Sequence, residues 1–233
     1  MDFRRVLIKI SGESMSGSGA FGAFDLGVIQ KICQNIKNVV DMGIDVSLVV
    51  GGGNIIRGKS LDNDLIDRLT SDSMGMMSTV INGLVIRRIL QNIGVESIIF
   101  SSLDLPFGIQ KSSDISSFDI RNRVVIFVGG TGYPYFSTDT AASINSLLCR
   151  ANIILKATKT DGIYDKDPAI FNDAIHIPNL TYSDALNQNL KIMDSTAFSI
   201  AMENRIKIIV FSIFEDDCFR RALKSDIKCS IVS

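Results

Sequence analysis

The stretch Val46-Ser47-Leu48-Val49-Val50-Gly51-Gly52-Gly53 is an apolar, valine-rich run that passes directly into three glycines. Runs of this kind are typical of strands buried on both faces of a parallel sheet. In open α/β sheets, ligands bind beyond the carboxyl ends of the strands, which is where these glycines stand. The segment therefore predicts an α/β protein with a binding site at the end of this strand.

Two other apolar runs end in the same way. Residues 6–10 lead into Ser11 and Gly12, and residues 124–128 lead into Gly129-Gly130-Thr131-Gly132. Three glycine-rich loops on one edge of a sheet indicate a polyphosphate held by backbone N–H groups and helix N-termini. A single loop would more often be a tight turn, but three together favour a phosphate site. Further strands are expected at residues 97–100, 153–155, 206–211 and 229–232.

Helical periodicity fills the gaps between these strands. Apolar residues recur every three or four positions from Leu26 to Gly43, after Asp25 as a start signal. We expect a long helix over 73–93 with Asp72 as its cap, a helix from Thr138 or Asp139 through Cys149, and a helix over 195–203. Alternating strands and helices predict a mainly parallel sheet covered on both faces, in one domain spanning residues 1–233.

Composition narrows the class of protein. The chain has 233 residues and a net charge of −1, so it lacks the electrostatic footprint of a protein that binds nucleic acid or an acidic membrane surface. The apolar run near the N-terminus is too short for the core of a signal peptide. No apolar stretch is long enough to span a membrane. Four scattered cysteines and one histidine argue against a zinc site and favour a reducing, cytoplasmic location.

One short motif indicates a different kind of phosphate site, the P-loop. Gly53-Asn54-Ile55-Ile56-Arg57-Gly58-Lys59-Ser60 matches the P-loop pattern G-x-x-x-x-G-K-[ST]. Two consecutive isoleucines stand where a P-loop backbone wraps phosphate, and apart from the run ending at Asp104 no strand supplies the expected metal-binding aspartate. The P-loop is therefore the weaker interpretation.

Six segments, in this order along the chain, resemble bacterial UMP kinases of the amino acid kinase family. The Asp72 and Gly130–Asp139 segments are the most specific, because the others also occur in the wider family. The segments are Lys9-Ile10-Ser11-Gly12-Glu13, Gly51–Gly58, Asp72-Ser73-Met74-Gly75-Met76, Gly130–Asp139, Lys156–Tyr164 and Lys191-Ile192-Met193-Asp194.

This resemblance implies a three-layer α/β/α sandwich, ATP and UMP as substrates, magnesium with the ATP, and a homohexamer. The reaction would transfer the γ-phosphate of ATP to UMP, giving UDP and ADP for pyrimidine nucleotide biosynthesis. The lobe that binds the nucleoside monophosphate would cover about residues 1–150, and the ATP lobe about residues 151–233.

The resemblance also implies roles for individual residues. Lys9, Arg57 and Asp139 are the expected catalytic residues, with Lys9 on the transferred phosphate and Asp139 orienting it. The expected ATP-binding residues are Lys9, Ser11, Gly12, Gly53, Arg57, Thr158, Tyr164 and Asp167. The expected UMP-binding residues are Gly52, Asp72, Thr131, Gly132 and Thr138. No residue is assigned as a metal ligand, the role of Asp194 is left open, and His176 is expected in a loop without a role.

Two alternatives stay open at this point. A kinase of the same fold could act on a small carboxylate or carbamate, or the protein could be a non-catalytic nucleotide-binding storage or sensor protein. The chain also departs from the family over residues 103–119, where it is shorter and has no tryptophan. Gln91 and Ile98 stand where some relatives carry groups for GTP regulation, so the sequence leaves open whether GTP activates the protein.

Overall fold

The computed structural model describes residues 4–16, 23–56, 65–106, 108–187, 190 and 193–233. Its strands are β1 (Arg5–Ile10), β2 (Asp45–Val50), β3 (Ser97–Ser101), β4 (Gln110–Lys111), β5 (Val124–Val128), β6 (Ile153–Thr158), β7 (Ile163–Tyr164), β8 (His176–Ile177), β9 (Asn179–Leu180), β10 (Lys207–Ser212) and β11 (Cys229–Val232). Its α-helices are α1 (Leu26–Val40), α3 (Arg68–Asn92), α4 (Thr138–Leu148), α5 (Tyr182–Asn187), α6 (Ser195–Glu203) and α7 (Cys218–Leu223), and two 3₁₀ turns cover Gly12–Met15 (η1) and Ser112–Ser117 (η2).

The strands form one sheet of nine, in the order β4-β3-β5-β2-β1-β6-β10-β11-β9. Every pairing in it is parallel except that of β10 with β11. A separate antiparallel pair joins β7 and β8. The predicted mainly parallel α/β sheet is therefore confirmed, with β1 near its centre.

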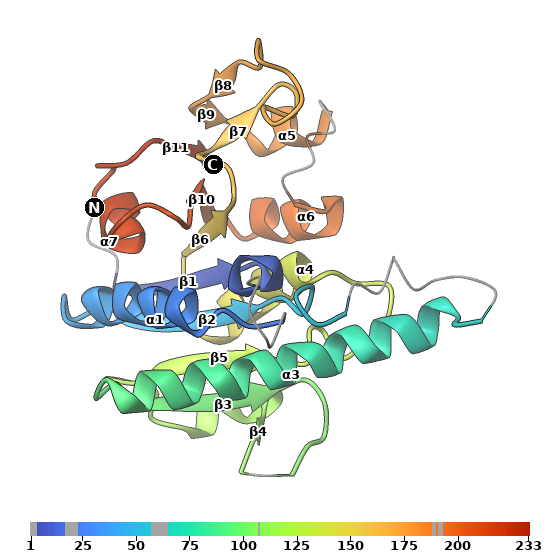
Figure 1. Ribbon diagram of the computed structural model, residues 1–233, viewed down its shortest axis with the longest axis vertical. Helices are drawn as coiled ribbons and strands as arrows, with labels where there is room; N and C mark the ends of the chain where they lie inside the picture. The colour runs from blue at the N-terminus through green and yellow to red at the C-terminus, as the bar shows by residue number, and fades with distance from the viewer. Residues whose placement is uncertain (1–3, 17–22, 57–64, 107, 188–189, 191–192) are drawn as a thin grey trace.

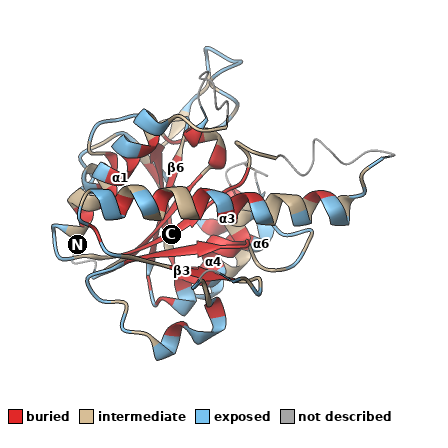
Figure 2. Ribbon diagram, turned by 60° about the horizontal axis from the view of Figure 1, so that its bottom comes forward, coloured by how far each residue is buried: buried red, intermediate tan, exposed pale blue. Residues whose placement is uncertain are grey.

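Alternation along each strand builds two hydrophobic cores, one on each face of the sheet. In β1, Ile8 and Ile10 face the core shared with α1, α3 and α7, whereas Leu7 faces the core shared with α4 and α6. Figure 1 shows α1 and α3 on the near face of the sheet, and Figure 2 shows the buried strands between the covering helices. This is the expected α/β/α sandwich.

The long helix begins earlier than predicted. α3 starts at Arg68, and its cap is Asp67, whose side chain accepts a hydrogen bond from the backbone N–H of Thr70. The expected cap, Asp72, is instead one turn inside the helix. The prediction was wrong because the first turn extends beyond the sheet, where no apolar periodicity marks it (Figure 1).

The cap of α4 also differs from the prediction. Ser137 caps this helix: its Oγ accepts hydrogen bonds from the backbone N–H groups of Asp139 and Thr140 at 2.9 and 3.3 Å. Neither Thr138 nor Asp139 is therefore needed as a cap, which leaves both side chains for other contacts. His176, expected in a loop, lies in the short strand β8.

Strands from both halves of the chain belong to the same sheet, since β1 pairs with β6 directly. The division into two lobes near residue 150 stays a prediction. Within the described residues, no helix is both long enough and apolar enough to cross a membrane.

Candidate active site

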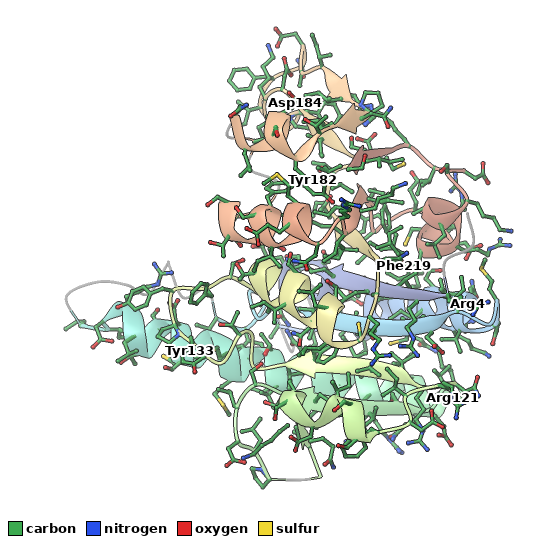
Figure 3. The ribbon with its side chains drawn as sticks, turned by 180° about the vertical axis from the view of Figure 1, so that it is seen from behind. Arg4, Arg121, Tyr133, Tyr182, Asp184 and Phe219 are labelled. Atoms are coloured by element: carbon green, nitrogen blue, oxygen red, sulfur yellow. The ribbon has the colours of Figure 1, made fainter. Side chains whose placement is uncertain are left out.

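The loops that follow the parallel strands gather at one edge of the sheet. Figure 3 shows Tyr133, from the loop after β5, beside α3 at one end of the molecule, and Arg4 and Arg121, which precede β1 and β5, at the other end. Most of the described candidate residues lie at the edge that Tyr133 marks, because they stand at the carboxyl end of a strand, in the loop after it or in the first turns of the next helix. The structure thereby brings the glycine loops together, as predicted.

The first two glycine loops touch each other through their backbones. A Cβ atom placed on Gly12 would lie 2.6 Å from the backbone nitrogen of Gly53 and 2.7 Å from the carbonyl oxygen of Gly51. Only glycine fits there without moving backbone. Asn82 of α3 fixes the second loop from behind, since its amide donates a 2.7 Å hydrogen bond to the Gly51 carbonyl. The expected phosphate-binding loops therefore form one packed unit.

Two lysines and one aspartate form an ion-paired cluster under this unit. The Nζ atom of Lys9 lies 2.7 Å from Oδ1 of Asp139, and the Nζ atom of Lys156 lies 2.6 Å from Oδ2. All three side chains are at least 85% buried, with exposed fractions of 9, 8 and 15% for Lys9, Lys156 and Asp139. The expected contact between Lys9 and Asp139 is present, but Lys156 was not among the predicted site residues.

The charges in the cluster shift one another's proton affinity. Burial by itself raises the pKa of Asp139, but the attraction of Lys9 and Lys156 outweighs it and holds that pKa well below its usual range. Burial lowers the pKa of Lys156 to about 8, against the opposing attraction of Asp139. Asp139 is therefore ionised at neutral pH, and Lys156 loses its proton more readily than an ordinary lysine.

Asp194 joins the N-termini of α4 and α6. It caps α6 by accepting from the backbone N–H of Ala197 at 2.9 Å, and it accepts from the hydroxyl of Thr140 at 2.8 Å and from that of Ser137. Its carboxylate is therefore occupied by a structural network in the described residues. This contact fixes the first turn of α4, which carries Asp139.

Asp72 ties α3 to the loop that follows β5. Its Oδ2 accepts a 2.7 Å hydrogen bond from the backbone N–H of Tyr135 and a 2.8 Å hydrogen bond from Nε of Arg68. The guanidinium of Arg68 also lies over the Tyr135 ring, 5.5 Å from its centre. Both polar contacts fall on one oxygen, so among the described residues Oδ1 is the atom of Asp72 that can face a ligand.

The other expected UMP residues shape the same loop. The hydroxyl of Thr131 donates to the carbonyl of Tyr133 and accepts from its N–H, which closes a tight turn. Gly132 has φ +82°, and a Cβ there would lie 2.9 Å from the carbonyl of Ser102, so glycine is required. Thr138 begins α4 and lies close to Gly51. The structure therefore brings Thr131, Gly132 and Thr138 together around the loop between β5 and α4.

Three of the expected ATP residues, Thr158, Tyr164 and Asp167, lie at the end of β6 or after it. The hydroxyl of Thr158 donates to the carbonyl of Thr160 at 2.8 Å. The hydroxyl of Tyr164 donates to Asp161 at 2.5 Å and accepts from Lys228 at 2.8 Å. The carboxylate of Asp167 accepts from the backbone N–H of Ala169, which turns the loop after β7. In the strand order of the sheet, β1 with Lys9 lies between β6, which carries Thr158, and β5, whose following loop contacts Asp72.

Some expected residues lie outside the described part of the chain. Arg57 is one of them, as are Lys59 and Ser60 of the P-loop pattern. Ser11 and Gly53 are described; Ser11 directly follows β1, and Gly53 lies in the loop after β2. Within the described residues, no group of three or more His, Cys, Asp and Glu side chains is placed to hold a metal ion. The four cysteines are unpaired, and burial raises the pKa of the Cys33 and Cys218 thiols to about 12.

Comparison with known proteins identifies the family. The sequence model of the amino acid kinase family matches residues 4–212. The chain belongs to the amino acid kinase family. Within this family it is 44% identical to the uridylate kinase of Sulfurovum sp. (strain NBC37-1), over 98% of this chain and 99% of that protein. It is 40% identical to the uridylate kinase of Brucella anthropi, over 99% of this chain and 97% of that protein.

Solved structures agree with this assignment. The UMP kinase of Ureaplasma parvum superposes with a TM-score of 0.92 at 36% identity, over the full length of both chains. The UMP kinase of Bacillus anthracis superposes with a TM-score of 0.90 at 28% identity, over 100% of this chain and 97% of that one. The expected amino acid kinase fold is confirmed.

Sequence reasoning missed Lys156 although a signal was present. A lysine follows three apolar residues at 153–155, as Lys9 follows residues 6–8, and in both strands the charge comes near the carboxyl end. A charged side chain in an otherwise buried strand costs free energy unless it is paired. The repeated pattern could therefore have indicated a second buried cation beside the first.

Proposed function

We propose that this protein is a UMP kinase, which transfers the γ-phosphate of ATP to UMP and gives UDP and ADP for pyrimidine nucleotide biosynthesis. The observation that carries the proposal is the ion pair of Lys9 with Asp139, 2.7 Å long and buried at the meeting point of the glycine loops. Phosphoryl transfer needs two aligned nucleotides and a cation near the migrating group. Lys9 supplies that cation, and Asp139 holds it in place.

The two substrates are assigned to opposite sides of this ion pair. UMP is expected against Gly52, Asp72, Thr131, Gly132 and Thr138. Oδ1 of Asp72, which has no hydrogen-bond partner among the described residues, would accept from the ribose hydroxyls. ATP is expected against Lys9, Ser11, Gly12, Gly53, Arg57, Thr158, Tyr164 and Asp167. The N-terminus of α4 faces the region between them, and its dipole favours the phosphates.

Magnesium is proposed to enter with ATP. Both oxygens of Asp139 are engaged by lysines, and the described residues form no cluster of acidic side chains that would bind a metal alone. Such a site fits an ion carried by nucleotide phosphates and water rather than one held in a protein cage. When bound, magnesium would neutralise charge on the phosphates of ATP. Lys9 would then act on the oxygens that the metal leaves free.

The relatives favour this substrate over the alternatives. Proteins named uridylate kinase are 40–44% identical to this chain over nearly its whole length. A storage or sensor protein would need phosphate contacts but not a buried lysine aligned between two nucleotide sites.

A substrate panel tests the proposal. ADP formation is measured with ATP and magnesium, and with UMP, CMP, dUMP, glutamate or aspartate as the acceptor. We expect a strong preference for UMP in kcat/KM. Turnover on a carboxylate alone would overturn the substrate, and tight nucleotide binding without any turnover would favour the storage or sensor function.

Self-association into a homohexamer in the cytoplasm is also proposed. Met77 and Ile81, one turn apart on α3, are 46 and 44% exposed. A row of exposed apolar side chains on a long helix supports a contact with a second copy of the chain. The four unpaired cysteines support a reducing compartment.

A further inference from the structure

Lys9 and Lys156 occupy equivalent positions on neighbouring strands. They are direct partners in the parallel pairing of β1 with β6. Leu7 and Ile154, two residues before each lysine, belong to the core on the α4 and α6 side of the sheet. Because side chains alternate between faces, both lysines also point to that side. The first turn of α4, with Asp139, lies directly over them.

Asp139 divides its two oxygens between the two lysines, Oδ1 to Lys9 and Oδ2 to Lys156. The carboxylate therefore cannot turn about its own axis without breaking an ion pair. If Lys156 were absent, Oδ2 would be buried with its partner removed, and Lys9 would face the whole negative charge alone. A lysine that is fully neutralised by its partner has less charge to offer to a phosphate.

The charge balance around the site is a second reason why the site depends on Lys156. The groups that face Lys156 are Asp139 from α4, Lys9 from β1 and Asp194 from the cap of α6. Two lysines balance two carboxylates in this set. Removal of Lys156 would leave one net negative charge at the place where the polyphosphate is expected, and buried charges are weakly screened.

We propose that Lys156 is a positioning residue of the phosphoryl-transfer site: it holds Oδ2 of Asp139, so that Asp139 presents Lys9 to the transferred phosphate without neutralising the site. This inference rests on the proposed function. It assigns to Lys156 an effect on turnover that acts through Asp139 and Lys9. A lysine that only filled space in the core would not produce that effect.

Two substitutions separate charge from volume. Lys156→Met keeps the length of the side chain and removes the charge, and we expect kcat to fall about 10²-fold, the scale of losing one charge-stabilising group. Lys156→Arg keeps the charge and should recover most of the lost activity. Lys207→Met is the matched control, because Lys207 opens the neighbouring strand β10 at the opposite edge of the sheet.

The pH profile is the readout that a structural role would not move. Lys156 is charged below its pKa of about 8 and neutral above it. The kcat/KM for ATP, which reports the free enzyme, should therefore fall as the pH rises above about 8 in the wild-type protein. In Lys156→Arg the fall should move to a much higher pH, because arginine keeps its proton.

The experiment measures UMP-dependent ADP formation from pH 6.5 to about 10 for the wild type and the three variants, with thermal unfolding as the check of folding. A Lys156→Met variant with wild-type kcat, or a Lys156→Arg variant with an unchanged fall above pH 8, would overturn the inference. If Lys156→Met fails to fold, the Lys156→Arg profile still decides. Lack of turnover in the wild type would overturn the proposed function instead.

Discussion

Asp139 shows how one residue acquires a role from its neighbours. The same carboxylate on an exposed helix would have an ordinary pKa and no fixed direction. Here burial raises its pKa, and two ammonium groups more than compensate and hold that pKa low. The result is an ionised, oriented carboxylate at the N-terminus of α4, with Lys9 on one oxygen and Lys156 on the other.

Lys9→Met is expected to lower kcat by about two to three orders of magnitude, because it removes the cation assigned to the transferred phosphate. UMP binding should change little, since the assigned UMP contacts do not include Lys9. Steady-state kinetics and equilibrium binding of UMP check the two parts separately. Unchanged kcat would remove Lys9 from the mechanism.

Asp72→Ala is expected to raise the KM for UMP by about 10- to 100-fold, the effect of losing a charged hydrogen bond worth about 1.5–3 kcal/mol. The same change also frees the N–H of Tyr135, which Asp72 holds at 2.7 Å. Asp72→Asn is the matched comparison, because an amide oxygen can still accept from that N–H. An effect on the KM for ATP alone would contradict the assignment of Asp72.

At the scale of the element, α4 depends on a cap that lies just outside its active-site residues. Ser137 satisfies two backbone N–H groups of the first turn and also donates to Asp194. Asp194 in turn caps α6. The N-termini of the two helices are therefore held together, and the position of Asp139 depends on both.

Ser137→Ala is expected to lower the free energy of unfolding by about 1 kcal/mol, the typical effect of losing an N-cap. Thr138→Val should change stability much less, because Thr138 is inside the helix and does not cap it. Urea denaturation of both variants measures the difference. A larger loss for Thr138→Val would show that the cap is misassigned.

At the scale of the whole molecule, the sheet places the residues proposed to bind the two nucleotides at one edge and leaves one long helix with exposed apolar side chains. α3 covers one face of the sheet and extends past it at its N-terminal end (Figures 1 and 2). Val80, Ile86 and Leu90 of this helix are buried against the sheet, whereas Met77 and Ile81 remain exposed. A helix that is apolar on two sides has one side for its own core and one for a partner.

Ile81→Glu is expected to reduce the assembled mass, because it places a charge in the proposed contact between copies. Ile170→Glu is the control, since Ile170 is 70% exposed in the loop after β7 and outside α3. Sedimentation velocity compares both variants with the wild type. A monomeric wild type would contradict the hexamer, and an unchanged mass for Ile81→Glu would move the contact away from this helix.

The sequence alone determined the class of fold, because its signals are local. Valine-rich runs that end in glycine predict parallel strands with a site at their carboxyl ends, and helical spacing between the runs predicts the covering layers. Motifs in their order along the chain also identified the family, and the family model and the relatives confirm it.

Only the tertiary structure decided which side chains meet. Lys156 was missed because its place in the site depends on contacts between segments far apart in the chain. Asp72 and Thr138 were misread as caps because helical periodicity does not mark the exact first turn of a helix. Ser137 was identified as the cap from its contacts with the backbone N–H groups of Asp139 and Thr140. Lys156 became part of the site only when the register of β1 with β6 set it next to Lys9 under Asp139. Register and helix docking are set by packing of the whole core, which no local stretch of sequence encodes.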